Sequence, residues 1–288
     1  MRTTGTVLLL LLLSALGAWW WLFAVPAVAT AELPATAAAI ERGRYLLAAG
    51  GCVSCHEGTE HPGTLSGGLA LESDFGTFFA PNITPDVETG IVGWSGEDFL
   101  RALKHGRGPQ GRFYYPAFPY PSYAGMTDQD VLDIGAYLMS LPPVAFRAPD
   151  HVLPGWLFRW TIAGWNRLAD LLAPEPAPAA DPVVARGAYL ARHLGHCGEC
   201  HTPRSALGIP DLQREFAGGS LPEGKVEAID AGALSGWTEQ QFALFLSLGL
   251  KPDGDFVGGE MEPVIEHNTS RLTSEDQQAL AAFFIRGQ

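Results

Sequence analysis

Two copies of one short cysteine motif are the residues of this chain best suited to chemistry. Each copy reads Cys-x-x-Cys-His, and together they use every cysteine of the 288-residue chain: Cys52, Cys55 and His56, then Cys197, Cys200 and His201. Two thiols at this spacing can add across the two vinyl groups of a haem, and the adjacent histidine then reaches the iron. The motifs therefore predict two covalently bound haems of the c type, each with a histidine as iron ligand.

Other readings of the cysteine pairs fit less well. A zinc ribbon needs its two pairs about 15–20 residues apart, whereas Cys55 and Cys197 are far separated. A thioredoxin-like redox pair needs a βαβ context, which neither flank shows. Disulfide bonds would leave the histidine after each pair unexplained. Covalent haem attachment accounts for all six residues.

The opposite face of each iron needs a sixth ligand, which in electron-transfer haems is usually methionine or a second histidine. Of the four methionines, Met1 starts the chain and Met139 lies within a helical pattern. Elimination leaves Met126 for the first haem and Met261 for the second, and these are the predicted axial ligands. If Met126 only fills space in the core, His105 could serve instead, or the first iron could have five ligands.

An internal repeat supplies the elements that would position these ligands. It has three pieces, each present once in either half of the chain: 41–51 with 185–196, 93–106 with 236–249, and 127–138 with 273–284. Apolar residues recur in all of them at helical spacing, and no segment shows strong strand alternation. The sequence therefore predicts an all-α fold with two tandem domains, residues 32–145 and 181–288.

Sequence signals bound these predicted helices. The middle pieces should begin at capping boxes and end at glycines, and the last pieces should begin at threonines followed by acidic residues. The residues concerned are Ser95 with Asp98, Thr238 with Gln241, Gly106, Gly249, Thr127 and Thr273.

The amino-terminal segment is apolar and uncharged from residue 7 to residue 28, with Arg2 before it. A run of about 20 apolar residues can span a bilayer, and an arginine on the cytoplasmic side would place the rest of the chain outside. Trp19–Trp21 favour such an anchor, whereas the small residues Ala27–Ala29 resemble the cleavage site of a secretory signal. Residues 1–31 are therefore predicted to be a membrane anchor or a signal peptide. Either one exports the chain to the bacterial periplasm, where c-type haem is attached.

A linker of different composition, residues 146–180, separates the two predicted domains. Its first part is apolar and contains Trp156, Trp160 and Trp165, and a proline-rich spacer follows at 173–181. The apolar part could lie on the membrane surface. We expect it instead to pack in the crevice between the domains, because aromatic anchors commonly bury at such interfaces.

The charge of the chain argues against one class of partner. The formal net charge is −13 and the sequence pI is near 4.9. Nucleic-acid binding needs basic surface, so a nucleic-acid partner is excluded. An acidic surface either serves solubility alone or docks a partner that carries a basic patch.

The chain resembles the dihaem and multihaem cytochrome c subunits that accompany membrane-bound alcohol and aldehyde dehydrogenases of bacteria. The resemblance covers most of the chain and rests on long runs, among them GRYLLAAGGCVSCH, FGTFFAPNITPDVETGIVGWSGEDFLRALKHG and RGAYLARHLGHCGECHTPRSALG. It implies two cytochrome c-type domains, with Asn82 beside a haem propionate and with Trp94 and Trp237 against or near their haems. For the two tryptophans, ordinary helix packing is the alternative.

Two departures from that family pattern concern the ligands. The pattern often has its ligand methionine where Phe118 stands, and Met261 matches that position whereas Met126 matches Leu272. The second half has no counterpart of the PNIT run, because a shortened loop with EAID, residues 227–230, stands there. Propionate contacts are therefore expected only in the first half.

The resemblance also implies a function. We expect a membrane-anchored periplasmic electron carrier of the respiratory chain with no catalysis of its own, on the periplasmic side of the bacterial inner membrane. It would relay single electrons from a periplasmic dehydrogenase or another carrier to a downstream cytochrome or a terminal oxidase. It could be a free carrier or a fixed subunit of a respiratory complex. The alternative is a dihaem redox enzyme with an open first haem, like a peroxidase.

Overall fold

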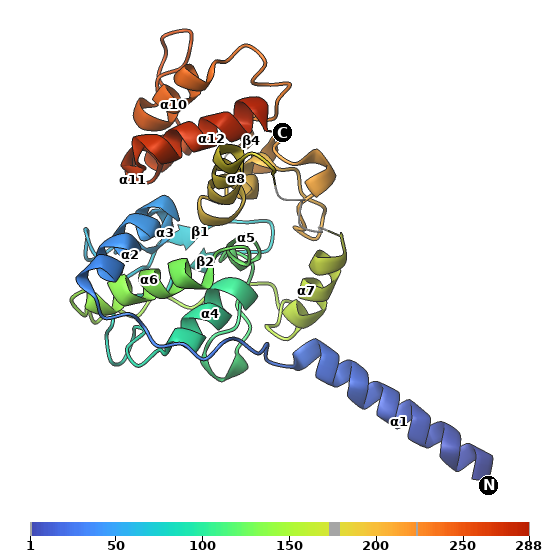
Figure 1. Ribbon diagram of the computed structural model, residues 1–288. Helices are drawn as coiled ribbons and strands as arrows, with labels where there is room; N and C mark the ends of the chain where they lie inside the picture. The colour runs from blue at the N-terminus through green and yellow to red at the C-terminus, as the bar shows by residue number, and fades with distance from the viewer. Residues whose placement is uncertain (1, 173–178, 223, 288) are drawn as a thin grey trace.

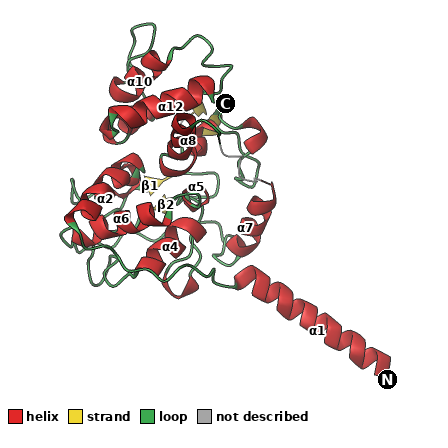
Figure 2. Ribbon diagram, viewed as in Figure 1, coloured by secondary structure: helices red, strands yellow, loops and turns green. Residues whose placement is uncertain are grey.

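The computed structural model describes residues 2–172, 179–222 and 224–287, and its regular structure is almost entirely helical (Figure 2). The α-helices are α1 (Arg2–Phe23), α2 (Ala37–Ala49), α3 (Cys52–His56), α4 (Gly96–His105), α5 (Tyr120–Tyr123), α6 (Asp128–Ser140), α7 (Thr161–Leu172), α8 (Pro182–Tyr189), α9 (Gly198–His201), α10 (Glu239–Leu248), α11 (Met261–His267) and α12 (Ser274–Arg286). Shorter helical turns are η1 (Pro109–Gly111), η2 (Leu190–Leu194), η3 (Leu212–Arg214) and η4 (Thr269–Arg271).

The all-α prediction needs one correction, because each half also contains a short two-stranded antiparallel sheet. Strand β1 (Ala70–Leu71) pairs with β2 (Phe78–Phe79), and β3 (Gly219–Leu221) pairs with β4 (Gly224–Val226). Strands of two or three residues are too short to leave an alternating pattern in the sequence. Each sheet follows the cysteine motif of its own half.

The first and last helices of each half cross at a glycine. In the first half α2 packs against α6, and in the second α8 packs against α12 (Figure 1). A Cβ atom at Gly43 would overlap the carbonyl oxygen of Asp133, and one at Gly187 would overlap the carbonyl oxygen of Ala279. Only glycine allows two helix backbones to approach this closely. This crossing explains why the same glycine occurs in both copies of the repeat.

The predicted helix ends are confirmed in both halves. Capping boxes begin α4 and α10, threonine N-caps begin α6 and α12, and glycines in the left-handed conformation end α4 and α10. The residues are Ser95 with Asp98, Thr238 with Gln241, Thr127, Thr273, Gly106 and Gly249.

A π-helical turn, η2, absorbs a length difference between the two copies of the repeat. The second half has one more residue than the first between the shared Arg-Gly pair and the cysteine motif. The Gly195 N–H donates to the carbonyl of Leu190 at 2.6 Å, whereas the Gly50 N–H donates to the carbonyl of Leu46 at 2.7 Å. Leu46 and Leu190 are equivalent in the repeat, so the wider π turn restores the register. Such turns are frequent at functional sites.

The buried apolar side chains form one cluster that continues through both halves. It includes Phe99 and Ile134 from the first half and Phe216 and Phe283 from the second, all nearly inaccessible to solvent. A second, smaller cluster surrounds Phe113 beside α7. The division into domains at 32–145 and 181–288 remains a prediction, and part of the linker between them, 173–178, lies outside the described residues.

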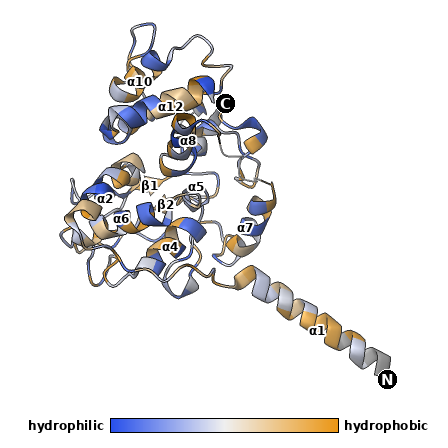
Figure 3. Ribbon diagram, viewed as in Figure 1, coloured by the Kyte–Doolittle hydropathy of each residue, from blue (hydrophilic) through white to orange (hydrophobic). Residues whose placement is uncertain are grey.

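Helix α1 projects from the globular part as an exposed apolar rod (Figure 3). From Gly5 to Phe23 it is long and apolar enough to cross a membrane. Its carboxyl end is fastened: Arg107 donates to the carbonyls of Phe23 and Ala24 at 3.0 and 3.2 Å, and Arg167 donates to the carbonyl of Trp21 at 2.8 Å. The end of α1 is therefore fixed against α7 and the first half.

The apolar part of the linker corrects one expectation. Trp156 and Trp160 are each 61% exposed, so they do not fill a crevice between the halves. Ile162 of α7 is buried instead against the first half, in the smaller cluster. Trp165 does reach the second half, where its Nε1–H donates to the carbonyl of Leu207 at 2.8 Å. The sequence could not separate these residues because all of them lie in one apolar stretch.

Candidate haem-binding sites

The two cysteine motifs form short helices, α3 and α9, set in apolar surroundings. Burial raises the pKa of the Cys52 and Cys197 thiols to about 12. Cys200 is the most exposed of the four cysteines, yet the surrounding protein still raises its pKa to about 11. Sulfurs in such surroundings suit a large apolar macrocycle.

Both motif histidines are held by a backbone carbonyl through Nδ1. In His56 this nitrogen lies 2.8 Å from the oxygen of Pro81, and in His201 it lies 2.7 Å from the oxygen of Glu227. A carbonyl oxygen can only accept, so Nδ1 must carry the proton, which leaves Nε2 with a free lone pair. Burial also lowers the pKa of both rings, which favours the neutral form that binds metals. Both histidines therefore fit the role of haem-iron ligand, with the second-shell partner that ligating histidines generally have.

Pro81 and Glu227 are functional residues that sequence reasoning missed. The family resemblance points only to the asparagine of the PNIT run, and it gives no role to the EAID loop that stands in its place in the second half. Because the contact uses a main-chain oxygen, it needs no particular side chain, and so the two halves share it without sharing sequence. The equal placement of the loop after the motif was the only signal available.

Asn82 is buried, and its side chain is already engaged within the protein. Its Nδ2 donates to the Val144 carbonyl at 2.7 Å and to Thr89 Oγ1 at 3.0 Å, and its Oδ1 accepts from the Thr84 N–H at 2.9 Å. These bonds fix the loop that presents the Pro81 carbonyl. The predicted contact between Asn82 and a propionate remains a prediction, and it would require one of these donors to be shared.

Trp94 and Trp237 occupy equivalent places, each just before the middle helix of its half. The Trp94 ring meets the Phe99 ring edge-on, with 5.3 Å between the ring centroids. The Trp237 ring meets the Phe242 and Phe245 rings in the same way, with centroid distances of 5.8 and 5.5 Å. Both rings pack partly buried against the shared core. Helix packing is thus observed for both, and their contact with haem stays a prediction.

Met126 is buried to 2% exposure in the shared core. Its N–H donates to the carbonyl of Tyr123, at the end of α5. Burial raises the pKa of the Tyr123 phenol, and the nearby Cys52 and Cys55 raise it further. The segment that carries Met126 therefore lies near the first cysteine motif, as an axial ligand of the first haem requires.

Met261 begins α11 and is partly exposed. The preceding residue, Glu260, is close enough to Cys200 to contribute to its raised pKa, although burial is the main cause. Glu260 thus lies near Cys200, whereas α11, which begins at Met261, packs against α3, the helix of the first motif. Ligation by Met126 and by Met261 stays a prediction.

His105, the alternative ligand for the first haem, lies in a separate cavity. It lines a cavity of about 200 Å³ between the end of α4, the end of α1 and α7, together with Tyr120 and Asn166. None of the motif cysteines and histidines lines this cavity. The geometry therefore favours Met126 over His105.

The structure also brings the two motifs close to each other. The third residue of each motif contacts the other half: Ser54 Oγ lies 3.4 Å from Asn268 Oδ1, and Glu199 Oε1 accepts from Ser122 Oγ at 2.6 Å. Cys55 is near enough to Cys200 to contribute to its pKa. The two predicted attachment sites therefore lie close to each other.

Comparison with known proteins agrees with this geometry. Residues 40–142 match the family model described as cytochrome c. The chain is 44% identical to a dihaem cytochrome c-type protein of Cereibacter sphaeroides, over 85% of this chain and 84% of the relative. This chain belongs to the cytochrome c family.

Further relatives of the cytochrome carry names of dehydrogenase subunits. It is 38% identical to the gluconate 2-dehydrogenase cytochrome c subunit of Pantoea cypripedii, over 88% of this chain and 61% of the relative. It is 35% identical to the cytochrome c subunit of the quinone alcohol dehydrogenase of Gluconobacter oxydans, over 91% of this chain and 57% of the relative. These two relatives are therefore considerably longer than the matched region.

Membership of this family implies covalently bound haem c. The residues present fit that group, since each motif offers two free thiols and one imidazole with a free Nε2. The family match covers the first motif directly, and the second motif has the same local geometry.

Proposed function

We propose that the cytochrome carries two haem groups and relays single electrons as a subunit of, or partner to, a periplasmic dehydrogenase. The observation that carries the proposal is the duplicated imidazole geometry, in which His56 and His201 each bond a backbone carbonyl through Nδ1. A bound haem supplies a reversible one-electron couple between ferric and ferrous iron. The chain's own residues hold that couple in place and exclude water from it.

Each proposed ligand has a defined task. The paired sulfurs, Cys52 with Cys55 and Cys197 with Cys200, would fix the macrocycle as thioethers. The carbonyls behind the two histidines keep each ring in one tautomer and one orientation, and they raise the basicity of Nε2. The sulfurs of Met126 and Met261 would close the opposite face and favour the ferrous state.

A dehydrogenase as electron donor is supported by the relatives. Several of them are cytochrome subunits of gluconate, alcohol and fructose dehydrogenases. We propose the same kind of donor here, with a downstream cytochrome or a terminal oxidase as acceptor. The formal charge of −13 suits partners with basic docking surfaces.

The proposed location is the periplasmic face of the bacterial inner membrane. Support comes from α1, whose exposed apolar length suffices to span a bilayer and whose end is hydrogen-bonded to the globular part by Arg107 and Arg167. This fixed junction favours an anchor that remains part of the mature protein. It would hold the haem sites at a constant height above the membrane.

A pyridine haemochrome assay of the exported, denatured protein tests the proposal. We expect two covalently bound haems per chain, and one haem per chain after joint replacement of Cys197 and Cys200 by alanine. A wild-type protein with one haem or none would contradict it. In separate samples of the native protein, a far-red absorption band from methionine to ferric iron is expected for both haems, whereas tight carbon monoxide binding to the reduced protein would indicate the open, peroxidase-like site.

A further inference from the structure

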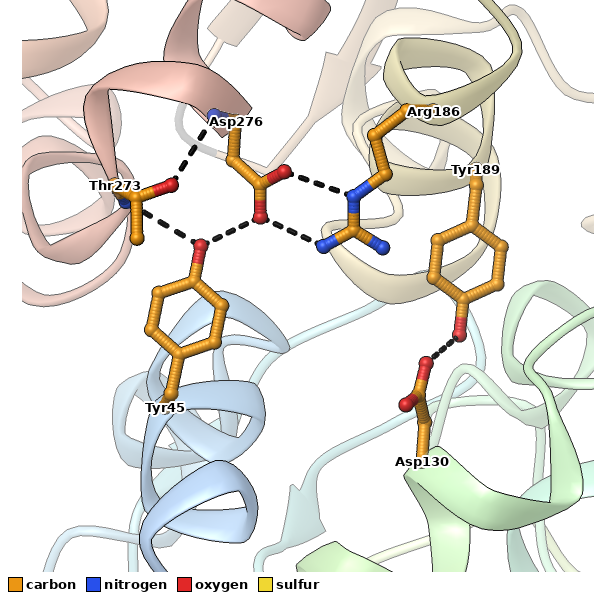
Figure 4. Close-up of polar contacts among 6 residues, drawn as sticks. All are labelled: Tyr45, Asp130, Arg186, Tyr189, Thr273 and Asp276. Carbon is orange, nitrogen blue, oxygen red and sulfur yellow. Dashed lines mark hydrogen bonds and ion pairs between the residues drawn. The ribbon is translucent and has the colours of Figure 1, made fainter. Parts of the chain in front are cut away.

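The two halves meet through tyrosines that reach across to helix ends of the other half (Figure 4). Tyr45 projects from α2 of the first half towards the start of α12. Its hydroxyl donates to Asp276 Oδ2 at 2.6 Å and accepts from the Thr273 N–H at 3.3 Å. Burial and the hydrogen bond to Asp276 raise the pKa of Tyr45 to about 12, so the hydroxyl keeps its proton at neutral pH. One phenol thus caps the amino end of a helix in the other half.

Tyr189 makes the same contact in the opposite direction. It projects from α8 of the second half, donates to Asp130 Oδ2 at 2.5 Å and accepts from the Thr127 N–H at 3.3 Å. Tyr45 and Tyr189 are equivalent residues of the repeat, and so are the two aspartates and the two threonines. The interface is therefore pseudo-symmetric, with each half holding the other.

The two contacts differ in one respect. Asp276 also accepts two hydrogen bonds from Arg186, at 2.8 Å and 2.6 Å. The equivalent arginine of the first half, Arg42, instead bonds Asp133 at 2.8 Å and leaves Asp130 to Tyr189. The Tyr45 contact is thus reinforced by an ion pair and the Tyr189 contact is not. We therefore expect the Tyr45 contact to contribute more than the Tyr189 contact to the free energy that holds the two halves together.

Beyond the carboxyl ends of the helices that carry these tyrosines, α2 and α8 with η2, the loops that lead into the cysteine motifs lie against each other. Gly51 and His196, the residues directly before Cys52 and Cys197, both have left-handed backbones, with φ of 68° and 42°. A Cβ at Gly51 would lie 3.3 Å from Cε1 of His196. A left-handed histidine is strained and persists only where its surroundings fix it. The surroundings here are the opposite loop.

Tyr123 packs against both of these loops. Its hydroxyl donates to the Gly50 carbonyl at 2.8 Å, and its ring meets the His196 ring edge-on at 5.4 Å. Side chains from both halves thus pack between the two motifs. Any tilt of one half on the other would change the separation of the attachment points.

Building on the proposed dihaem function, we propose that Tyr45 and Tyr189 are positioning residues for electron exchange between the two haem sites. In that exchange one electron leaves the reduced site, which is oxidised, and enters the other site, which is reduced. The rate of such a transfer falls steeply with the distance between the two sites. By fastening each helix that leads into a motif loop to the other half, the two phenols hold that distance short and constant.

The test compares the full-length holoprotein with Tyr45→Phe, Tyr189→Phe and the double variant. The first readout is the exciton couplet in the Soret circular dichroism, whose amplitude depends on the distance and angle between two haems. The second is the rate of intramolecular electron exchange after photoreduction of one haem. Tyr120→Phe is the matched control, since it removes a buried phenol hydrogen bond, to Asn166 Oδ1, that does not join the two motif-bearing halves.

We expect a smaller couplet in each interface variant and roughly tenfold slower exchange in the double variant, because each lost bond to a carboxylate favours opened arrangements. Tyr45→Phe should have the larger single effect. An unchanged couplet and rate in the double variant, or the same losses in Tyr120→Phe, would overturn the assignment. A wild-type protein with fewer than two haems, or without a couplet, would instead count against the proposed dihaem function.

Discussion

At the scale of single residues, the carboxylate of Asp276 bonds side chains from both halves of the molecule. It is the third residue of α12, it pairs with Arg186 of its own half, and it accepts from Tyr45 of the other half. Burial works against its ionisation, but the hydrogen bonds from Arg186 and Tyr45 outweigh burial, and the pKa of Asp276 lies below its usual value. The ionised form is therefore stabilised by folding.

This shift predicts a pH-dependent effect of Asp276→Asn. Because the folded-state pKa is depressed, the contribution of the carboxylate is complete above the unfolded-state pKa and is lost as the pH falls through the folded-state value. Allowing for the exposure of Arg186, we expect the variant to lose about 1–2 kcal/mol of unfolding free energy above about pH 5. The loss should shrink towards acid pH. Guanidinium unfolding across a pH series measures it.

The control for this experiment is Asp150→Asn, at an exposed position outside the interface. It should leave the unfolding free energy nearly unchanged at every pH. A deficit of Asp276→Asn that stayed constant down to acid pH would show that the ionised carboxylate is not the stabilising species.

How far the site could be predicted from the sequence depends on whether a residue acts through its side chain or through its main chain. Side chains that act through their own chemistry, such as the cysteines and His56, are visible in the sequence as a motif. Pro81 and Glu227 act through carbonyl oxygens, which every residue has, so no pattern could reveal them. His196 cannot be singled out from the sequence for a related reason, because its place beside Gly51 depends on how the two halves meet.

At the scale of elements, the helix ends were predictable because caps are local. Ser95, Thr238 and the terminating glycines act within four residues of themselves, so the sequence contains the whole interaction. The π turn η2 was not predicted, because a one-residue length difference says where a residue is added but not how the backbone accommodates it. The short sheets were missed because their pairing joins residues across a loop.

The glycine crossing of α2 and α6 predicts a large effect of a small substitution. In Gly43→Ala the new methyl group would meet the carbonyl oxygen of Asp133, which belongs to a helix backbone and cannot rotate away. We expect a loss of about 1–3 kcal/mol of unfolding free energy, as for other overpacked sites. Chemical denaturation followed by far-ultraviolet circular dichroism measures the loss.

Gly164→Ala is the control, and it should change the unfolding free energy in the opposite direction. Gly164 lies within α7, where an added Cβ meets nothing within 4 Å. Alanine is the better helix former, so this variant should gain roughly 0.5–1 kcal/mol. Equal effects of the two substitutions would mean that the close crossing does not constrain position 43.

At the scale of the whole molecule, the shared core matters more than the repeat. The sequence repeat suggested two domains, each with its own core, whereas the buried side chains of both halves form one cluster. Repeats report how a chain is built from copies, and they contain no information on whether the copies face each other. Only the packing of residues such as Leu46 and Leu190 in one cluster reveals the joint core.

A shared core predicts cooperative unfolding. Thermal or denaturant unfolding of the holoprotein should show one transition, with coincident midpoints for the Soret absorbance and for helix content. Joint replacement of Cys197 and Cys200 by alanine should lower that midpoint for the whole chain and not for the second half alone. Two separate transitions in the wild-type protein would contradict the joint core and favour independent halves.

The joint core also constrains how the protein is made. Neither half can complete its interior until the other has been made, because residues near the carboxyl end, such as Phe283, belong to the joint core. If the chain is exported as proposed, it would stay open until those residues emerge, and the first cysteine pair would be accessible for haem attachment during export. Maturation would then proceed in a fixed order, with haem attachment before the joint core forms. A chain cut short after its first motif would stay unfolded and would be degraded by periplasmic proteases.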